Sequence, residues 1–139
     1  MTVETYTGRC LCGAVLYRAD GPPLWVAHCH CESCRRNSGA AVLTFTGFAE
    51  DRSAYTHGAP ARYESSPRVW RSFCTRCGTP LTYESARHGA EVHVTIGAFD
   101  EPERLPPTAH VWTEEQIRWL HFRDDLPRHR RSGRESETA

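Results

Sequence analysis

Three short stretches hold all seven cysteines of the chain: Cys10-Leu11-Cys12, Cys29-His30-Cys31-Glu32-Ser33-Cys34 and Cys74-Thr75-Arg76-Cys77. Cysteines this close in sequence bring their sulfurs to one tight turn, as in tetrahedral thiolate metal sites. Thiolates are soft ligands that favour zinc or an iron–sulfur cluster. An odd number of cysteines also disfavours a closed disulfide framework. These stretches therefore predict a small domain that binds metal.

The first and third stretches end alike in Cys-Gly, and glycine lets the backbone turn tightly behind the second sulfur. We therefore predict one closed structural zinc site made of Cys10, Cys12, Cys74 and Cys77. The remaining cysteines form a second zinc site with only three protein ligands: Cys29, Cys31 and Cys34. Four-ligand zinc sites are structural, whereas three-ligand sites keep a position open for water or substrate.

The geometry of residues 28–34 supports the second site. In an extended segment Cys29 and Cys31 point one way, while the neighbouring histidines His28 and His30 point the other way and are predicted to support the site. Cys34 follows on the first turn of a short helix, whose positive end favours thiolates. A redox-active Cys31-x-x-Cys34 pair is the alternative interpretation of these residues.

Two arginines follow the second cysteine site directly. Arg35 and Arg36 are predicted to offset the negative charge of three thiolates on zinc, or to hold a carboxylate of the substrate. Four tryptophans and one histidine are predicted to lie in the core or the pocket walls, the histidine half-buried: Trp25, Trp70, Trp112, Trp119 and His110.

The composition narrows the class of protein. A chain of 139 residues suits a single domain, and it has 17 basic residues, all arginine, against 17 acidic ones. This balance gives no basic footprint for nucleic acid. No stretch approaches the ~18 apolar residues of a membrane span. The first six residues lack the pattern of a signal peptide, so we expect a cytoplasmic protein whose cysteines stay reduced.

Short strand-like runs dominate the remaining sequence, at residues 14–18, 24–28, 41–46, 61–64, 69–73, 92–96 and 108–113. Helix signals are weak and predict two short helices, over residues 32–38, where Gly39 would end the helix, and over residues 114–120. The predicted fold is mostly β. Residues 1–127 form the predicted domain, and the Arg-rich residues 128–139 form a loose, disordered tail.

The cysteine stretches and their neighbours resemble the glutathione-dependent formaldehyde-activating enzyme family, also called S-(hydroxymethyl)glutathione synthase-like. The resemblance rests on residues 8–15, 28–36 and 73–81, with less specific features at residues 96–100 and 110–112, and it covers roughly residues 5–127. It implies an Mss4-like fold of small antiparallel sheets. It also implies a structural zinc on the four-cysteine set and a catalytic zinc on Cys29, Cys31 and Cys34.

The resemblance further implies an enzyme of the carbon–sulfur lyase type. Its substrate would be a small thiol and aldehyde, in the form of a glutathione adduct of formaldehyde or of a related aldehyde. A metal lowers the pKa of a bound thiol and so supplies a nucleophile. Two alternatives remain open, a non-catalytic zinc-stabilised binding module and a thiol-redox or metal-handling protein. The sequence assigns no oligomeric state.

Overall fold

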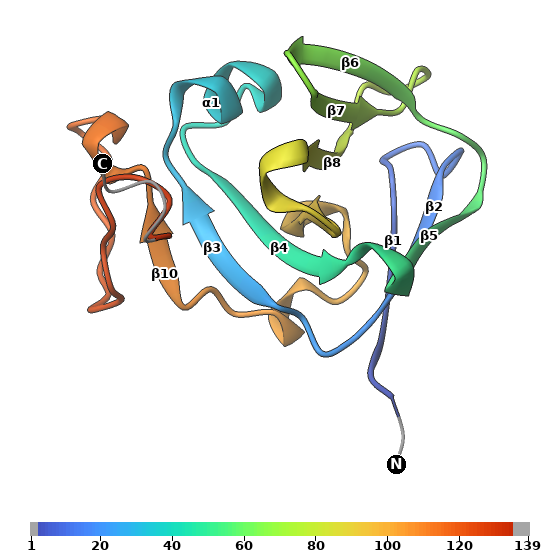
Figure 1. Ribbon diagram of the computed structural model, residues 1–139, viewed down its shortest axis with the longest axis horizontal. Helices are drawn as coiled ribbons and strands as arrows, with labels where there is room; N and C mark the ends of the chain where they lie inside the picture. The colour runs from blue at the N-terminus through green and yellow to red at the C-terminus, as the bar shows by residue number, and fades with distance from the viewer. Residues whose placement is uncertain (1–2, 135–139) are drawn as a thin grey trace.

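The computed structural model describes residues 3–134, and it consists of two β-sheets with one short α-helix in that range (Figure 1). The smaller sheet has the strand order β1-β2-β5, and the larger has the order β10-β3-β4-β9-β8-β7-β6. The strands are β1 (Thr5–Arg9), β2 (Leu16–Asp20), β3 (Trp25–Cys29), β4 (Leu43–Ala49), β5 (Ser53–His57), β6 (Ala61–Ser66), β7 (Val69–Phe73), β8 (Pro80–Ser85), β9 (Glu91–Thr95) and β10 (Ala109–Val111).

Antiparallel pairing joins all neighbouring strands except β10, which runs parallel to β3. The predicted mostly β fold is therefore confirmed. Each strand-like run of the sequence contains or overlaps a strand, and residues 69–73 match β7 at both ends. Three strands were not predicted: β1, β5 and β8.

The helix α1 (Glu32–Ser38) has the bounds that the sequence predicted. Cys31 caps its start, because the Cys31 sulfur accepts a hydrogen bond from the Cys34 N–H at 3.3 Å. Gly39 ends it with φ 75° and donates its N–H to the Arg35 carbonyl at 2.7 Å. A positive φ of this kind suits glycine, which lacks a Cβ. The helix therefore begins at one cysteine and presents another on its first turn.

The predicted helix over residues 114–120 is wrong. Only Thr113–Glu115 form a short 3₁₀ turn, because Gln116 takes an extended conformation with ψ 136°. The N–H groups of residues 112–114 donate to the carbonyls of residues 129–131, which holds this segment against the returning chain. A seven-residue helix also needs a packed apolar face to be stable, whereas Trp119 is 70% exposed. The other 3₁₀ turns are Glu50–Arg52, Ala86–His88, Ile96–Ala98 and Pro102–Arg104.

The first part of the predicted loose tail is held in place. Two backbone hydrogen bonds join it to β10. The His110 N–H donates to the Pro127 carbonyl, and the His129 N–H donates to the His110 carbonyl, both at 2.9 Å. Residues 128–134 thus follow β10 as a return segment, visible beside β10 in Figure 1. The remaining tail residues, 135–139, lie outside the described part of the chain.

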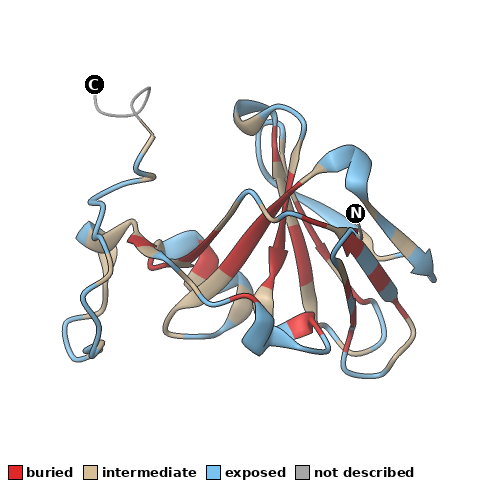
Figure 2. Cartoon of the chain, turned by 90° about the horizontal axis from the view of Figure 1, so that it is seen from below, coloured by how far each residue is buried: buried red, intermediate tan, exposed pale blue. Residues whose placement is uncertain are grey.

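The core is aromatic rather than aliphatic. Tyr6, Phe48 and Phe99 pack with ring centroids 5.7–6.3 Å apart between the two sheets, and Phe48 is fully buried. Figure 2 shows buried residues along the middle of the strands and exposed residues at their ends. A second buried cluster surrounds Cys10 and Cys74, and a third surrounds Cys29 and Cys34. Two cysteines of each set are thus part of the packed interior. No described helix is long and apolar enough to cross a membrane.

Candidate metal centres and pocket

The structure brings together the four cysteines that the sequence grouped. Sulfur–sulfur distances are 3.7 Å between Cys10 and Cys12 and 3.8 Å between Cys12 and Cys74, and Cys77 belongs to the same group. Zinc–sulfur bonds of ≈2.3 Å place the sulfurs of a tetrahedral site about 3.8 Å apart, so the four thiols fit zinc. The site joins residues 62 positions apart in sequence.

Backbone groups support this four-cysteine set. Gly13 and Gly78 have φ values of 81° and 79°, which only glycine adopts readily, and so each turn folds tightly behind its second cysteine. The N–H of Val15 donates to the Cys10 sulfur at 3.3 Å, and the N–H of Arg76 donates to the Cys74 sulfur at 3.4 Å. Such hydrogen bonds stabilise sulfur in its charged form. Both features suit a structural metal site.

The other three cysteines also meet, where β3 ends and α1 begins. The sulfurs of Cys29 and Cys34 are 3.6 Å apart, and all three sulfurs of the set lie within 4.8 Å of one another. Cys29 and Cys34 are buried, whereas Cys31 is partly exposed. We call these residues the cysteine triplet. All seven cysteines are free thiols, and both sets can hold a metal ion.

Hydrogen bonding distinguishes Cys31 within the cysteine triplet. Hydrogen bonds from the thiols of Cys29 and Cys34 lower the pKa of Cys31 far below its ordinary value, and the Cys34 N–H acts in the same direction. The contacts with the other two sulfurs, together with burial, raise the pKa of Cys29, and, against the contact with Cys29, the contact with Cys31 and burial raise that of Cys34. Without a metal ion, the negative charge of the set therefore lies on Cys31 as a thiolate, the form of cysteine that binds metal.

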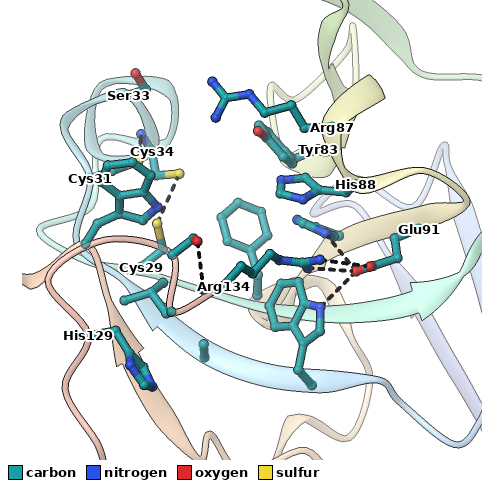
Figure 3. Close-up of a pocket in the computed structure, with 18 of the residues that line it drawn as sticks. Cys29, Cys31, Ser33, Cys34, Tyr83, Arg87, His88, Glu91, His129 and Arg134 are labelled. Atoms are coloured by element: carbon teal, nitrogen blue, oxygen red, sulfur yellow. Dashed lines mark hydrogen bonds and ion pairs between the residues drawn. The ribbon is translucent and has the colours of Figure 1, made fainter. Parts of the chain in front are cut away.

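A pocket of about 640 Å³ opens beside the cysteine triplet, and all three of its cysteines line the pocket. The four-cysteine set does not line this pocket. Figure 3 shows Cys29, Cys31 and Cys34 on one side, with Tyr83, His88 and Glu91 across from them. The strands β7, β8 and β9 supply the far wall, and the return segment supplies His129 and Arg134. The cysteine triplet thus faces a space of ligand size, and the four-cysteine set does not.

The pocket carries more positive than negative side chains. Three arginines line it, Arg71, Arg87 and Arg134, against two glutamates, Glu91 and Glu115. Arg134 is paired with Glu91 through hydrogen bonds of 3.1 and 3.3 Å. Although burial alone would raise the pKa of Glu91, the hydrogen bonds from Arg134 and Trp25 lower it to about 2. The pocket therefore offers arginine side chains with which a carboxylate of a ligand could pair.

The arginines that the sequence singled out lie elsewhere. Arg35 and Arg36 are on α1, and neither lines the pocket. The Arg36 side chain is 79% exposed and pairs with Glu32 at 3.1 Å on the same helix. The arginine that reaches the cysteine triplet is Arg71, whose Nη1 lies 3.7 Å from the Cys34 sulfur. A faint signal for Arg71 is present in the sequence, because the period of two in β7 places Arg71 on one face with Val69 and Phe73.

The histidines next to the cysteine triplet in sequence are hydrogen-bonded, and His30 belongs to a buried group. His30 is fully buried, and its Nε2 is 2.9 Å from Nδ1 of His110, which is also fully buried. His110 Nε2 lies 3.0 Å from a carboxylate oxygen of Asp124. His28 pairs with the Thr44 hydroxyl at 2.7 Å. The expected role of His28 and His30 at the cysteine site stays a prediction, and His110 is more deeply buried than the sequence predicted.

The four tryptophans have different environments. Trp25 and Trp112 line the pocket as predicted, and the Trp25 indole N–H donates to Glu91 at 3.0 Å. The Arg62 guanidinium lies over Trp70, with its carbon 4.6 Å from the centre of the Trp70 ring. Trp119 is exposed, so its predicted place in the core or the pocket wall is wrong. The sequence did not single out His88, Glu91, His93 or Arg134, which reach the pocket only through strand pairing and the return segment.

The structure is a mostly β fold with two cysteine clusters that could each hold a metal ion, one of them beside a pocket. The family model of the glutathione-dependent formaldehyde-activating enzyme matches residues 5–115. The chain therefore belongs to this family.

Related proteins agree with this assignment. A protein of Halomonas elongata whose name places it in the same family is 29% identical over 123 residues, which cover 81% of this chain and 78% of that protein. An uncharacterized lyase of Schizosaccharomyces pombe is 32% identical over 111 residues, covering 80% of each chain. The crystal structure of a Rhodobacter sphaeroides protein has the same fold, with a TM-score of 0.58 and 23% identity over 68% of this chain and 87% of that one.

Proposed function

We propose that the protein is a zinc-dependent enzyme of the carbon–sulfur lyase type, acting on the adduct of glutathione, or of another small thiol, with formaldehyde or a related aldehyde. The observation that carries the proposal is the cysteine triplet, whose three sulfurs line a pocket of about 640 Å³. A set with one ligand fewer than a closed site, placed at a pocket, leaves room for a ligand from solution.

Two zinc ions per chain are proposed. Cys10, Cys12, Cys74 and Cys77 would hold a structural ion, and Cys29, Cys31 and Cys34 would hold the ion at the pocket. An ion bound at the pocket would lower the pKa of the substrate thiol and hold its sulfur as a nucleophile. The three cysteines are thus the proposed catalytic residues, acting through the metal.

The reaction needs no oxidant or reductant. In the synthetic direction the thiol sulfur bonds to the carbonyl carbon, and the proton of the thiol ends on the former carbonyl oxygen; the lyase direction reverses both changes. Phe45, Val111 and Trp112 give the pocket an apolar wall beside the cysteines, which would keep water from the thiol. The pocket arginines favour a substrate that carries carboxylates, as glutathione does.

Arg35 and Arg36 were the arginines predicted to bind the substrate. Their place on α1, outside the pocket lining, makes them poorer candidates than Arg71, Arg87 and Arg134. Contact of Arg35 or Arg36 with a substrate would require the ligand to extend beyond the pocket lining. Seven free thiols and a glutathione substrate both suit a reducing cytoplasm, which we propose as the site of action.

The test combines metal analysis with a direct measurement of the adduct. We expect about two zinc ions per chain, and we expect the protein to speed the exchange between free glutathione and its formaldehyde adduct, as followed by exchange NMR. The Cys31→Ser variant should lose the acceleration and one zinc while staying folded. Two bound zinc ions without acceleration would instead favour a binding module. Reversible loss of thiols without a second zinc would favour a redox or metal-handling protein.

A further inference from the structure

Arg71 is a buried cation at the pocket without a carboxylate partner. The residue is 6% exposed, and no aspartate or glutamate among residues 3–134 lies within ion-pair distance of its guanidinium. Its Nε donates to the Ser65 hydroxyl at 3.2 Å, and the guanidinium lies 4.9 Å from the ring centre of Tyr83. Arginine stays charged in proteins, and a buried charge needs a compensating partner.

The available partner is sulfur. Arg71 Nη1 is 3.7 Å from the Cys34 sulfur, in a buried contact between β7 and α1. Strand β7 holds Arg71 rigidly, because it pairs with β6 on one side and β8 on the other. The hydrogen bond to Ser65 and the stacking on Tyr83 orient the guanidinium further. The contact with Cys34 is therefore built into the sheet rather than made by a mobile surface side chain.

The charges explain why such a contact matters. Three thiolates and one divalent ion carry a net charge of −1, and a fourth thiolate from a substrate would make it −2. Neither Arg35 nor Arg36 lines the pocket, whereas Arg71 lines it and contacts a cysteine of the triplet. In a buried site, where charges are weakly screened, one such cation changes the electrostatics strongly.

We propose that Arg71 is the positioning residue that compensates the charge of the cysteine triplet, through its contact with Cys34, and so sets the affinity of this site for its metal. The inference rests on one part of the proposed function, which is that the triplet binds a metal ion. Arg71 acts on the metal through a ligand, without touching the ion. It takes the role that the sequence assigned to Arg35 and Arg36.

The test measures metal affinity at each site separately, by competition with a chromophoric chelator. Arg71→Met removes the charge, and we expect the affinity of the triplet to fall about 10- to 100-fold, as is common when an outer-shell partner of a metal ligand is lost. Arg71→Lys keeps the charge and should recover most of the affinity. The four-cysteine set of the same molecule is the internal control, and its affinity should stay unchanged.

Arg104→Met is the matched control variant. Arg104 also stacks on a tyrosine, 4.3 Å from the ring centre of Tyr6, but does not line the pocket. Its loss should leave the affinity of the triplet unchanged. A variant that retains no metal ion at the four-cysteine set has not folded. If Arg71→Met behaves in this way, Arg71→Gln takes its place, with the same expected fall in the affinity of the triplet.

A spectroscopic signature separates this role from simple packing. In the cobalt-substituted protein, the spectrum of the triplet is obtained by subtracting that of Cys31→Ser, which keeps only the four-cysteine set. A nearby cation lowers the energy of the sulfur lone pairs, so its removal in Arg71→Met should move the sulfur-to-cobalt charge-transfer band to longer wavelength. Arg71→Lys should move the band less.

Three outcomes would overturn the inference. These are an unchanged triplet affinity in Arg71→Met, an equal loss at both metal sites, or a lysine variant that behaves like the methionine variant. A single metal ion per chain in the unmodified protein would be a different result, because it would overturn the proposed function and this inference with it. Two metal ions with an unaffected triplet in Arg71→Met would overturn the inference alone.

Discussion

Arg134 and Glu91 form a bidentate ion pair that connects the return segment to the wall of the pocket. The two hydrogen bonds are 3.1 and 3.3 Å long, and Glu91 also accepts the Trp25 indole N–H at 3.0 Å. The return segment ends the described chain, whereas Glu91 begins β9. This pair therefore closes one side of the pocket with a segment distant in sequence.

Removing the ion pair should loosen the return segment. In Glu91→Gln and Arg134→Gln we expect faster amide hydrogen exchange in residues 128–134. The coupling free energy in a double-mutant cycle should be about 0.5–1 kcal/mol, because the pair is partly exposed to solvent. Arg130→Gln, which breaks an exposed pair with Glu114, is the control and should leave the exchange near the pocket unchanged. Unchanged exchange in Glu91→Gln would contradict the proposed tie.

The two metal sites should differ sharply in their effect on folding. Cys74→Ser should unfold the chain, because structural zinc supplies roughly 10 kcal/mol or more of folding free energy. Cys31→Ser should keep the circular dichroism spectrum of the unmodified protein and lose one metal ion. Circular dichroism and metal analysis of both variants check this difference. A folded Cys74→Ser protein would show that the four-cysteine set is dispensable.

Gly47→Ala should disturb the pocket through Trp25. A Cβ at Gly47 would overlap the Trp25 indole, which would have to leave its place at the pocket wall and its hydrogen bond to Glu91. Overpacking of this kind costs about 1–3 kcal/mol. We expect a lower free energy of unfolding in urea and a changed Trp25 fluorescence. Gly97→Ala is the control, because a Cβ there meets nothing within 4 Å; an equal loss in both variants would contradict the prediction.

The stability of the protein should decrease with acid in a window that His93 sets. Burial lowers the pKa of His93 to about 3 from 6.5, and the neighbouring His88 acts in the same direction, against Glu91. As the pH falls, His93 is therefore protonated in the unfolded chain before it is protonated in the folded protein. The free energy of unfolding decreases as the pH falls from about 6.5 towards 3. At about 1.4 kcal/mol per pH unit, the loss from this residue at pH 5 is about 2 kcal/mol.

His93→Gln isolates this contribution. The groups that face His93 are Glu91 at 3.3 Å and the rings of Tyr83, His88 and Trp25. The free energy of unfolding is measured in urea at pH 7 and at pH 5, with saturating zinc. Its decrease between the two pH values should be smaller by about 2 kcal/mol in the variant than in the unmodified protein. An equal difference in both proteins would assign the acid sensitivity to other groups.

Local motifs account for what the sequence predicted well. The cysteine stretches put each sulfur within a few residues of a partner, and the shared Cys-Gly endings of the first and third stretches indicated that these two belong together. Gly39 marked the end of α1 in the same way, because a left-handed residue ends a helix wherever it packs. The strands β5 and β8 were missed, since β5 is mostly exposed and β8 begins with proline, which weakens the strand pattern.

Long-range pairing decides what the sequence did not predict. Arg71 reaches Cys34 only because the outer strands of the large sheet bring β7 to the start of α1. Arg35 and Arg36 are adjacent to Cys34 in sequence, yet the helix turns them away from the pocket. Arg134 belongs to a charged stretch without apolar residues, and its pairing with Glu91 depends on the return segment following β10.

The separation of the four-cysteine set along the chain has a consequence for biosynthesis. A ribosome completes the triplet by residue 34, whereas the first two ligands of the other set wait for a partner 62 positions beyond Cys12. During this interval Cys10 and Cys12 are present in the nascent chain without the other two cysteines of their set. The ligands of the triplet are therefore complete before those of the four-cysteine set, although the four-cysteine set begins first along the chain.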